Sequence, residues 1–292
     1  MLPAPAPKDL MTMRRLFLWI PALFLTLAAG HAHAASRREH PEWAPIFDDA
    51  GLRGTIVVYD ERNDTYDVFD AERAKHRYLP ASTFKLFNAM VALDTGAVKD
   101  EYETVPWDGT VRTLSGPPKT EWNRPNSLAS GMRYSTVWFY REMARRAGEP
   151  RMRDWLHRVG YGNEKIEGGI DDFWLNDTLR ISAEEQVAFL RRLADGTLPF
   201  SARAQETVRR IAITESQPTY VLHAKTGMAT EGAQNASKGK KSDGLGWYVG
   251  WVESNGRRWF FASNIDIVKP EDVDKRVEVA KRILAIEGAL PH

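Results

Sequence analysis

Strand-like segments lie at both ends of this 292-residue chain, with a long helical middle between them. Residues 55–59 and 66–69 are rich in β-branched and aromatic side chains, and Asn63 and Asp64 provide a turn between them. Strand segments return at residues 220–224, 245–253 and 257–267, and Asn255-Gly256 between the last two is a strong hairpin signal. Strands at both ends of a chain predict one antiparallel sheet in which the first and last segments pair.

The middle of the chain predicts helices. Apolar residues recur with helical spacing at residues 135–147, 151–159, 182–194 and 202–213, and again at 272–286. We therefore expect a mixed α/β fold, in which an antiparallel sheet formed from both chain ends is flanked by helices and carries an all-helical insert. The α/β part comprises about residues 35–96 and 216–292, and the helical part about 97–215. The cleft between the two parts is the natural place for a functional site.

The first 34 residues have the pattern of a secretory signal. Arg14 and Arg15 precede an apolar run at residues 16–29, and Ala32-His33-Ala34 provides a small-residue cleavage site. The apolar run is shorter than the roughly 20 residues that span a bilayer, so we expect no retained membrane anchor. We predict a signal peptide at residues 1–34, a single domain at 35–292 and a periplasmic location.

Charge and cysteine content exclude several classes of function. The formal net charge is +1 and the Lys and Arg residues are scattered, so nucleic acid is not an expected partner. The chain has no cysteine, which excludes disulfides and thiolate metal sites. Among the histidines, only His31 and His33 are close in sequence, and both precede the predicted cleavage point. We therefore expect no metal centre.

One short segment carries the strongest chemical signal. Ser82 and Lys85 are three residues apart at the start of an apolar helical run, so their side chains share one face of the helix. An uncharged amine, or a base formed from it, can take the serine proton and create a nucleophile. The same spacing recurs at Ser237 and Lys240, but that pair lies among glycine and lysine residues with no apolar face to support a helix.

Three further segments contain candidate site residues. Ser135 lies at the start of a predicted helix, where it can act as an N-cap or as a proton relay. Lys225-Thr226-Gly227 ends a predicted strand, and places a cation and a hydroxyl beside a glycine that permits close approach of a ligand. Tyr161-Gly162-Asn163 has the composition of a turn.

These segments occur in the order found in one enzyme family. From about Trp43 to Gly288 the sequence resembles the class D serine β-lactamases, the oxacillinase group. The resemblance rests on Pro80-Ala81-Ser82-Thr83-Phe84-Lys85, Ser135-Thr136-Val137, Tyr161-Gly162-Asn163, Phe173-Trp174-Leu175, Lys225-Thr226-Gly227, Gly246-Trp247, Val249-Gly250-Trp251, and Asn264-Ile265-Asp266-Ile267 followed by Arg276. Penicillin-binding proteins and class A enzymes share the Ser-x-x-Lys and Lys-Thr-Gly elements, whereas the Tyr-Gly-Asn and Phe-Trp-Leu elements point to class D. The resemblance implies a serine β-lactamase/transpeptidase-like fold and a small-molecule β-lactam substrate.

The resemblance also implies a covalent mechanism centred on Ser82. Ser82 would attack the β-lactam carbonyl and become acylated. Lys85, carboxylated by CO2 or bicarbonate, would be the general base for acylation and deacylation, and no separate cofactor is implied. An apolar pocket keeps an amine neutral because a buried ammonium is costly to desolvate. Val137, Trp174 and Leu175 would form that pocket, with the Trp174 indole N–H stabilising the carbamate; a plain core aromatic is the alternative for Trp174.

The other matched residues would bind the substrate. The backbone N–H groups of Ser82 and Met228 would form the oxyanion hole. Ser135 would pass a proton toward the β-lactam nitrogen, and Lys225 would keep the local field positive. The remaining assignments are carboxylate binding by Thr226 and Arg276, close approach of the substrate at Gly227, and a cleft wall formed by Tyr161 and Asn163. For Arg276, a surface salt bridge is the alternative.

Two departures from the family pattern concern substrate range. Met228 stands where many relatives have an aromatic residue, and the polar segment 229–244 is longer than in typical members. Two other functions use the same residues: a β-lactam sensor domain that is acylated without turnover, and a penicillin-binding transpeptidase or carboxypeptidase. Sustained hydrolysis of a penicillin separates a β-lactamase from both. The sequence is compatible with a monomer or a homodimer.

Overall fold

The computed structural model describes residues 1–4, 35–113, 119–175, 178–229 and 244–291. Residues 35–292 form one unit, separate from residues 1–34. The predicted signal peptide therefore falls almost entirely outside the described residues, as do Ser237, Lys240 and nearly all of the long polar segment. In the described parts of the chain, no helix has the length and apolar character needed to cross a membrane.

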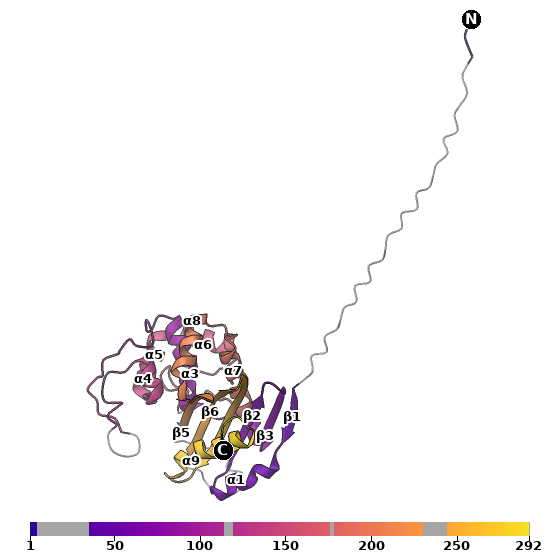
Figure 1. The fold of residues 1–292 in the computed structure, drawn as a ribbon. Coiled ribbons are helices and arrows are strands. Elements are labelled where there is room, and N and C mark those ends of the chain that lie inside the picture. Colours follow the sequence, from indigo (N-terminus) through magenta and orange to yellow (C-terminus); the bar gives the residue numbers. More distant parts are fainter. Residues whose placement is uncertain (5–34, 114–118, 176–177, 230–243, 292) are drawn as a thin grey trace. The chain divides into compact units, whose positions relative to one another are not determined.

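The centre of the fold is a sheet built from both ends of the chain, as predicted (Figure 1). Its strand order is β1-β3-β2-β7-β6-β5-β4. The strands are β1 (Ser36–Glu39), β2 (Gly54–Asp60), β3 (Thr65–Phe69), β4 (Ile213–Ser216), β5 (Tyr220–Ala229), β6 (Gly244–Ser254) and β7 (Arg257–Ile267). The early strand β2 pairs antiparallel with the late strand β7, which joins the two ends of the chain. Asn255 and Gly256 both have positive φ, at 51° and 69°, as the predicted tight hairpin between β6 and β7 requires.

Helices cover both faces of the sheet (Figure 1). They are α1 (Ala44–Asp49), α2 (Ala71–Lys75), α3 (Lys85–Asp94), α4 (Leu128–Arg133), α5 (Val137–Ala147), α6 (Glu149–Val159), α7 (Ala183–Ala194), α8 (Ala202–Ile211) and α9 (Asp272–Ile286), with 3₁₀ helices η1 (Pro41–Trp43) and η2 (Ala81–Phe84). Side chains of β2 alternate between two apolar cores: Val57 packs with the α3–α8 side, and Ile56 and Val58 pack with α1 and α9.

Several elements differ from the sequence predictions. The predicted strand 220–224 continues to Ala229, so Lys225-Thr226-Gly227 lies inside β5 and does not end it. The predicted helix 202–213 ends at Ile211 because the chain there turns into the short edge strand β4. Strand β1 runs parallel to β3, in contrast to the other pairs of the sheet. The short helices α1, α2 and α4 have too few turns to show a helical period in the sequence.

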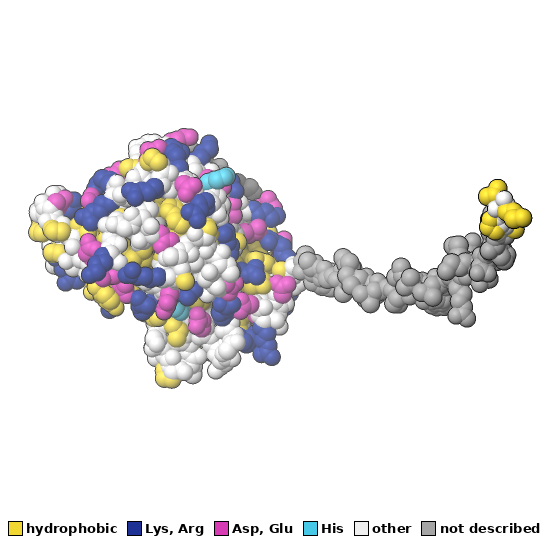
Figure 2. Space-filling view, turned by 90° about the horizontal axis from the view of Figure 1, so that it is seen from above, with side chains coloured by type: hydrophobic (Ala, Val, Ile, Leu, Met, Phe, Trp, Pro, Cys, Tyr) yellow, Lys and Arg dark blue, Asp and Glu magenta, His cyan; other side chains and the backbone are white. Residues whose placement is uncertain are grey.

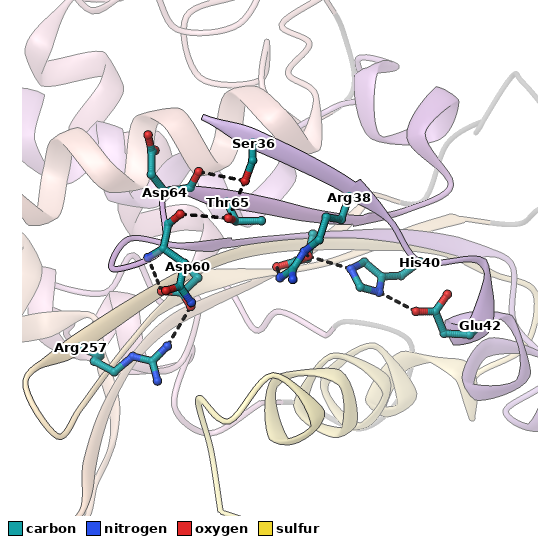
Figure 3. Close-up of polar contacts among 10 residues, drawn as sticks. Ser36, Arg38, His40, Glu42, Asp60, Asp64, Thr65 and Arg257 are labelled. Atoms are coloured by element: carbon teal, nitrogen blue, oxygen red, sulfur yellow. Dashed lines mark hydrogen bonds and ion pairs between the residues drawn. The ribbon is translucent and has the colours of Figure 1, made fainter. Parts of the chain in front are cut away.

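Strand β1 is held by polar contacts (Figure 3). Arg38 donates two hydrogen bonds to the carboxylate of Asp67, at 2.7 and 2.9 Å, and the Asp67 side chain is fully buried. The His40 ring bridges two carboxylates, with Nε2 2.7 Å from Asp67 and Nδ1 2.7 Å from Glu42. All four residues of β1 are exposed, so its sequence has no apolar alternation that could predict a strand.

The surface carries charges of both signs. Figure 2 shows Lys and Arg side chains intermixed with Asp and Glu over the face that it displays. Many of these charges form ion pairs across the surface, for example Arg77 with Glu185 and Arg153 with Glu149. Mixed charge of this kind is typical of a solvated surface.

Candidate active site

Ser82 lies in a tight turn that several contacts hold in place. Ala81, the residue before it, has φ of 49°, a left-handed conformation that a residue with a Cβ seldom adopts. Its N–H donates to the carbonyl oxygen of Trp174 at 3.0 Å. The Thr83 hydroxyl donates to the carbonyl of Pro80 at 2.7 Å and accepts from Gln186 Nε2 at 2.7 Å. These contacts fix η2, here named the Ser82 turn, which leads directly into α3.

Lys85 is buried beside Ser82, as the spacing predicts. Its side chain is 1% exposed, and Nζ lies 2.7 Å from Ser82 Oγ. Burial lowers the pKa of Lys85 well below its usual value, and the positive charges of Lys225 and Arg141 lower it further. The ring of Tyr140 lies on another side of the amine, with its centroid 5.4 Å from Nζ. A neutral amine is therefore favoured at this position.

Ser135 and Lys225 join the same site from different elements. The Lys225 ammonium donates to Ser135 Oγ at 3.1 Å and to the Thr226 carbonyl at 2.9 Å. Burial lowers the pKa of Lys225 to about 7, and the charge of Arg276 contributes. Ser135 has φ of 56°, and the N-cap of α5 is the next residue, Thr136. The N-cap interpretation of Ser135 is therefore wrong, because the helix begins one residue too late for it.

The free edge of β5 faces the Ser82 turn. The Ala224 N–H donates to Ala212 at 2.9 Å, so it points away from β6. The pairing of β5 with β6 has no register shift, so the N–H of Met228, four residues later, points to the same side. A Cβ on Gly227 would lie 3.1 Å from the Pro80 carbonyl oxygen and 3.2 Å from Thr83 Cγ2. The glycine thus allows the strand to approach the turn closely.

Arg276 projects from α9 toward the same region. Its Nε and Nη1 atoms are buried and have no hydrogen-bond partner among the described residues. Burial lowers the pKa of Arg276. Since the guanidinium also forms no ion pair within the described parts of the chain, the surface salt-bridge alternative is not supported. A buried, unpaired cation of this type gains most from an anionic ligand.

A cavity of about 440 Å³, here named the Ser82 cavity, joins these residues. Of the predicted site residues, its lining contains Ser82, Ser135, Val137, Leu175, Thr226, Gly227, Met228 and Arg276. Lys85 and Lys225 are buried just behind the wall and reach it through Ser82 and Ser135. Trp174 is 1% exposed and stacks on Phe84 with the ring centroids 5.3 Å apart, which places it in the core beside the Ser82 turn.

The predicted cleft-wall role of Tyr161 and Asn163 is wrong, because neither residue lines the Ser82 cavity. Tyr161 is 1% exposed and packs against Phe84 and Phe87 in the core. Asn163 bridges two loop segments: its Nδ2 donates to the Thr178 carbonyl at 2.8 Å, and its Oδ1 accepts from the Arg180 N–H at 2.9 Å. Both residues support the structure behind the site.

The sequence did not identify other residues that line the Ser82 cavity: Lys119, Trp122, Arg133, Tyr134, Arg141, Ala229 and Val273. Arg141 follows Val137 by four residues on α5, so a shared helix face was a signal that could have found it. Trp122 lies in a loop, where no periodic pattern exists. Among the described residues, no group of His, Asp and Glu side chains has the arrangement to hold a metal ion.

Comparison with known proteins identifies the family. Residues 54–285 match the family described as the penicillin binding protein transpeptidase domain. The chain is 37% identical to the β-lactamase OXA-48 of Klebsiella pneumoniae, over 96% of this chain and 100% of that protein. It is 39% identical to the β-lactamase OXA-20 of Pseudomonas aeruginosa, over 96% and 99% of the two chains.

Solved structures give the same result. The crystal structure of the class D β-lactamase YbXI from Nostoc is 39% identical, with a TM-score of 0.78 and coverage of 85% of this chain and 99% of that one. The class D β-lactamase FUS-1 (OXA-85) from Fusobacterium nucleatum is 36% identical, with a TM-score of 0.79 and coverage of 87% and 100%. The chain therefore belongs to the class D serine β-lactamases and is an enzyme of that family.

Proposed function

We propose that this enzyme hydrolyses β-lactam antibiotics through an acyl-Ser82 intermediate, with carboxylated Lys85 as the general base. One observation carries the proposal: a buried Lys85 amine, 1% exposed, lies 2.7 Å from Ser82 Oγ. A positioned base of this kind typically contributes about 10²- to 10⁴-fold to the rate. Family membership supports the reaction, and the geometry supports these residues as its carriers.

The surroundings of Lys85 fit carboxylation by CO2. Only a neutral amine captures CO2, and burial together with Lys225 and Arg141 lowers the pKa of Lys85. Val137 and Leu175 line the adjacent cavity wall and Trp174 packs close by, so apolar side chains border this part of the cavity. When bound, the carboxyl group supplies an anionic base with two acceptor oxygens.

Acylation uses the groups around Ser82 Oγ. Oγ forms a bond to the lactam carbonyl carbon while the Oγ proton is transferred toward Lys85. The N–H groups of Ser82 and Met228 stabilise the developing oxyanion, and one such donor is typically worth about 3 kcal/mol. The carbon–nitrogen bond of the lactam ring then breaks, and the nitrogen receives a proton through Ser135. Lys225 resupplies that proton across its 3.1 Å contact with Ser135 Oγ.

Substrate binding uses further residues of the same cavity. Every classical penicillin carries a carboxylate on the ring fused to the lactam. We assign this group to Arg276, whose Nε and Nη1 have no partner among the described residues, and to the Thr226 hydroxyl. Gly227 permits close approach of the substrate to β5. Water then adds to the acyl-Ser82 ester carbon and loses a proton on the Lys85 side. The bond from that carbon to Ser82 Oγ breaks, and Oγ takes the proton back.

We also propose that the enzyme acts in the periplasm after removal of residues 1–34. The apolar run and the Ala32-His33-Ala34 sequence support a cleaved signal. N-terminal sequencing of the exported protein tests this proposal. A mature chain that begins at about residue 35 supports it, and an uncleaved chain retained in the cytoplasm contradicts it.

Turnover of benzylpenicillin by the purified enzyme tests the central proposal. We expect sustained hydrolysis that falls when dissolved CO2 is removed and recovers when bicarbonate is added. Acylation that stops after one equivalent, with no further product, would identify a sensor-like protein and overturn the hydrolase. Sustained hydrolysis that does not respond to CO2 would remove the carboxylated base and leave the acyl-Ser82 route.

A further inference from the structure

The described lining of the Ser82 cavity contains four cations, Lys119, Arg133, Arg141 and Arg276, and no carboxylate. One anion on the substrate, the ring carboxylate, accounts for Arg276. The other three cations have no partner in the proposed mechanism. Lys119 and Arg133 form no ion pair with any described residue and lie over the aromatic rings of Trp122 and Tyr134, at 5.6 and 5.9 Å from the ring centroids.

Arg141 lies where the Ser82 cavity meets a second cavity of about 250 Å³, here named the side cavity. The two cavities share Trp122, Val137 and Arg141. The side cavity adds Arg112 and Arg145 to the lining, again with no carboxylate among the described lining residues. The space beyond Arg141 is therefore bordered by arginines and aromatic rings. Arg112 pairs with Asp108, and Arg145 pairs with Glu142 and Asp171.

Asp172 holds Arg141 but uses only part of its hydrogen-bonding capacity. The Nη2 atom of Arg141 pairs with Asp172, which directly precedes the Phe173-Trp174-Leu175 segment. The Nε atom is buried and has no hydrogen-bond partner in the described parts of the chain. The side chain remains about one-third exposed, at 35%. A guanidinium has five N–H donors, so it can hold Asp172 and a second carboxylate together.

The chemistry of a penicillin places its substituents on different sides of the reactive carbonyl. The ring carboxylate extends from the ring fused to the lactam. The acylamino side chain extends from the lactam ring carbon next to the carbonyl. With the ring carboxylate at Arg276, other parts of the cavity lining, among them Trp122, Val137 and Arg141, are available to the acyl side chain. We propose that Arg141 selects penicillins whose acyl side chain carries a second carboxylate; this inference rests on the hydrolysis proposed above.

Three penicillins that differ mainly at one carbon test the inference: carbenicillin with an α-carboxylate, benzylpenicillin with hydrogen, and ampicillin with an α-ammonium. We expect the ratio of kcat/KM for carbenicillin to that for benzylpenicillin to fall about 10-fold in Arg141→Gln, mainly through KM for carbenicillin. In the same variant, the ratio of kcat/KM for ampicillin to that for benzylpenicillin should rise, because a cation near the α-ammonium is removed. A ratio within one enzyme cancels general losses of activity, so reduced folding of the variant does not imitate the effect.

Two further variants sharpen the result. Asp172→Asn releases Arg141 from its carboxylate partner, so the preference for carbenicillin should increase. Arg146→Gln serves as the matched control: Arg146 is also on α5, pairs with Glu142 and lines neither cavity, so the ratio should stay within about 2-fold of the original.

Equal carbenicillin-to-benzylpenicillin ratios in the original enzyme, Arg141→Gln and Asp172→Asn would overturn the inference while leaving the hydrolase intact. A loss of kcat/KM in Arg141→Gln that is equal for all three substrates and is restored by bicarbonate would also overturn the inference. Arg141 would then act through Lys85 and not through the acyl side chain. Absence of turnover with every penicillin would instead reject the proposed function together with the inference.

Discussion

At the scale of single residues, the site contains two buried lysines with different neighbours. Lys85 has its pKa held well below the usual value by burial and by the charges of Lys225 and Arg141. Lys225 has its pKa lowered to about 7 by burial and by Arg276. An exposed lysine titrates near 10.4. Lys225 can therefore exchange protons at neutral pH, which a relay through Ser135 requires.

Arg276→Ala should change both substrate binding and the pH profile. The proposed mechanism needs protonated Lys225, and burial and the Arg276 charge lower the pKa of Lys225, so kcat/KM of the original enzyme should fall on the alkaline side of the pH profile. Removing the Arg276 charge raises the pKa of Lys225, so this fall should move to higher pH. Loss of the charged hydrogen bond should also lower kcat/KM by about 10- to 100-fold, mainly through KM.

A pH–rate profile of kcat/KM for benzylpenicillin checks this prediction. Arg282→Ala is the matched control, because Arg282 is an exposed arginine on the same helix. The control should keep the original profile. An alkaline limb that stays at the same pH in Arg276→Ala would contradict the electrostatic coupling between Arg276 and Lys225.

Gly227→Ala should displace the Ser82 turn. The added methyl group would lie 3.1 Å from the Pro80 carbonyl and 3.2 Å from Thr83 Cγ2, so the turn or β5 must move by a few tenths of an ångström. Because small misplacements of reacting groups are costly, we expect kcat/KM to fall by about 10- to 100-fold. Overpacking should lower the free energy of unfolding by about 1–3 kcal/mol. Unchanged kinetics would show that the close approach is not needed.

At the scale of elements, β1 depends on charge where the other strands depend on apolar packing. Asp67 on β3 accepts hydrogen bonds from Arg38 and contacts the His40 ring. Burial tends to lower the pKa of His40, but hydrogen bonds to Asp67 and Glu42 outweigh it, so the pKa is raised above 6.5. Arg38 on β1 and Glu287 after α9 also lie close enough to influence this cluster.

His40→Gln should lower the stability of the protein, and the loss relative to the original chain should be larger at acidic pH than at alkaline pH. A raised histidine pKa contributes stability that is full below about pH 6.5 and is lost as pH rises through the folded-state value. Thermal denaturation from pH 5.5 to 9 measures the difference in Tm. The difference should be largest at the acidic end and shrink with rising pH. A difference independent of pH would mean that His40 acts only through its stacking on Trp43.

At the scale of the whole molecule, periodic patterns predicted the parts of the fold that pack on the core. The α9 boundaries and the pairing of β2 with β7 are confirmed, because long apolar repeats determine them. Strand β1 and the extension of β5 to Ala229 were missed. Charged contacts hold β1, and pairing with β6 determines the length of β5. Neither kind of interaction produces a local pattern in the sequence.

The site follows the same rule. Ser82 and Lys85 were found because their spacing along one helix determines their contact. Tyr161 was assigned to the cleft wall from the family resemblance alone, whereas its ring packs in the core. Trp122 enters the cavity through loop conformation, which only three-dimensional structure reveals, whereas Arg141 follows Val137 by one turn of α5 and could have been predicted from that spacing.

Mass spectrometry of Lys85→Ala mixed with benzylpenicillin tests the central claim most directly, with Ser82→Ala as the control that cannot be acylated. The account predicts slow formation of a stable adduct with the mass of the intact penicillin on Ser82, while the original enzyme returns to its unmodified mass after hydrolysis. A Lys85→Ala enzyme that turns over penicillin at the original rate, or an adduct on a residue other than Ser82, would contradict it.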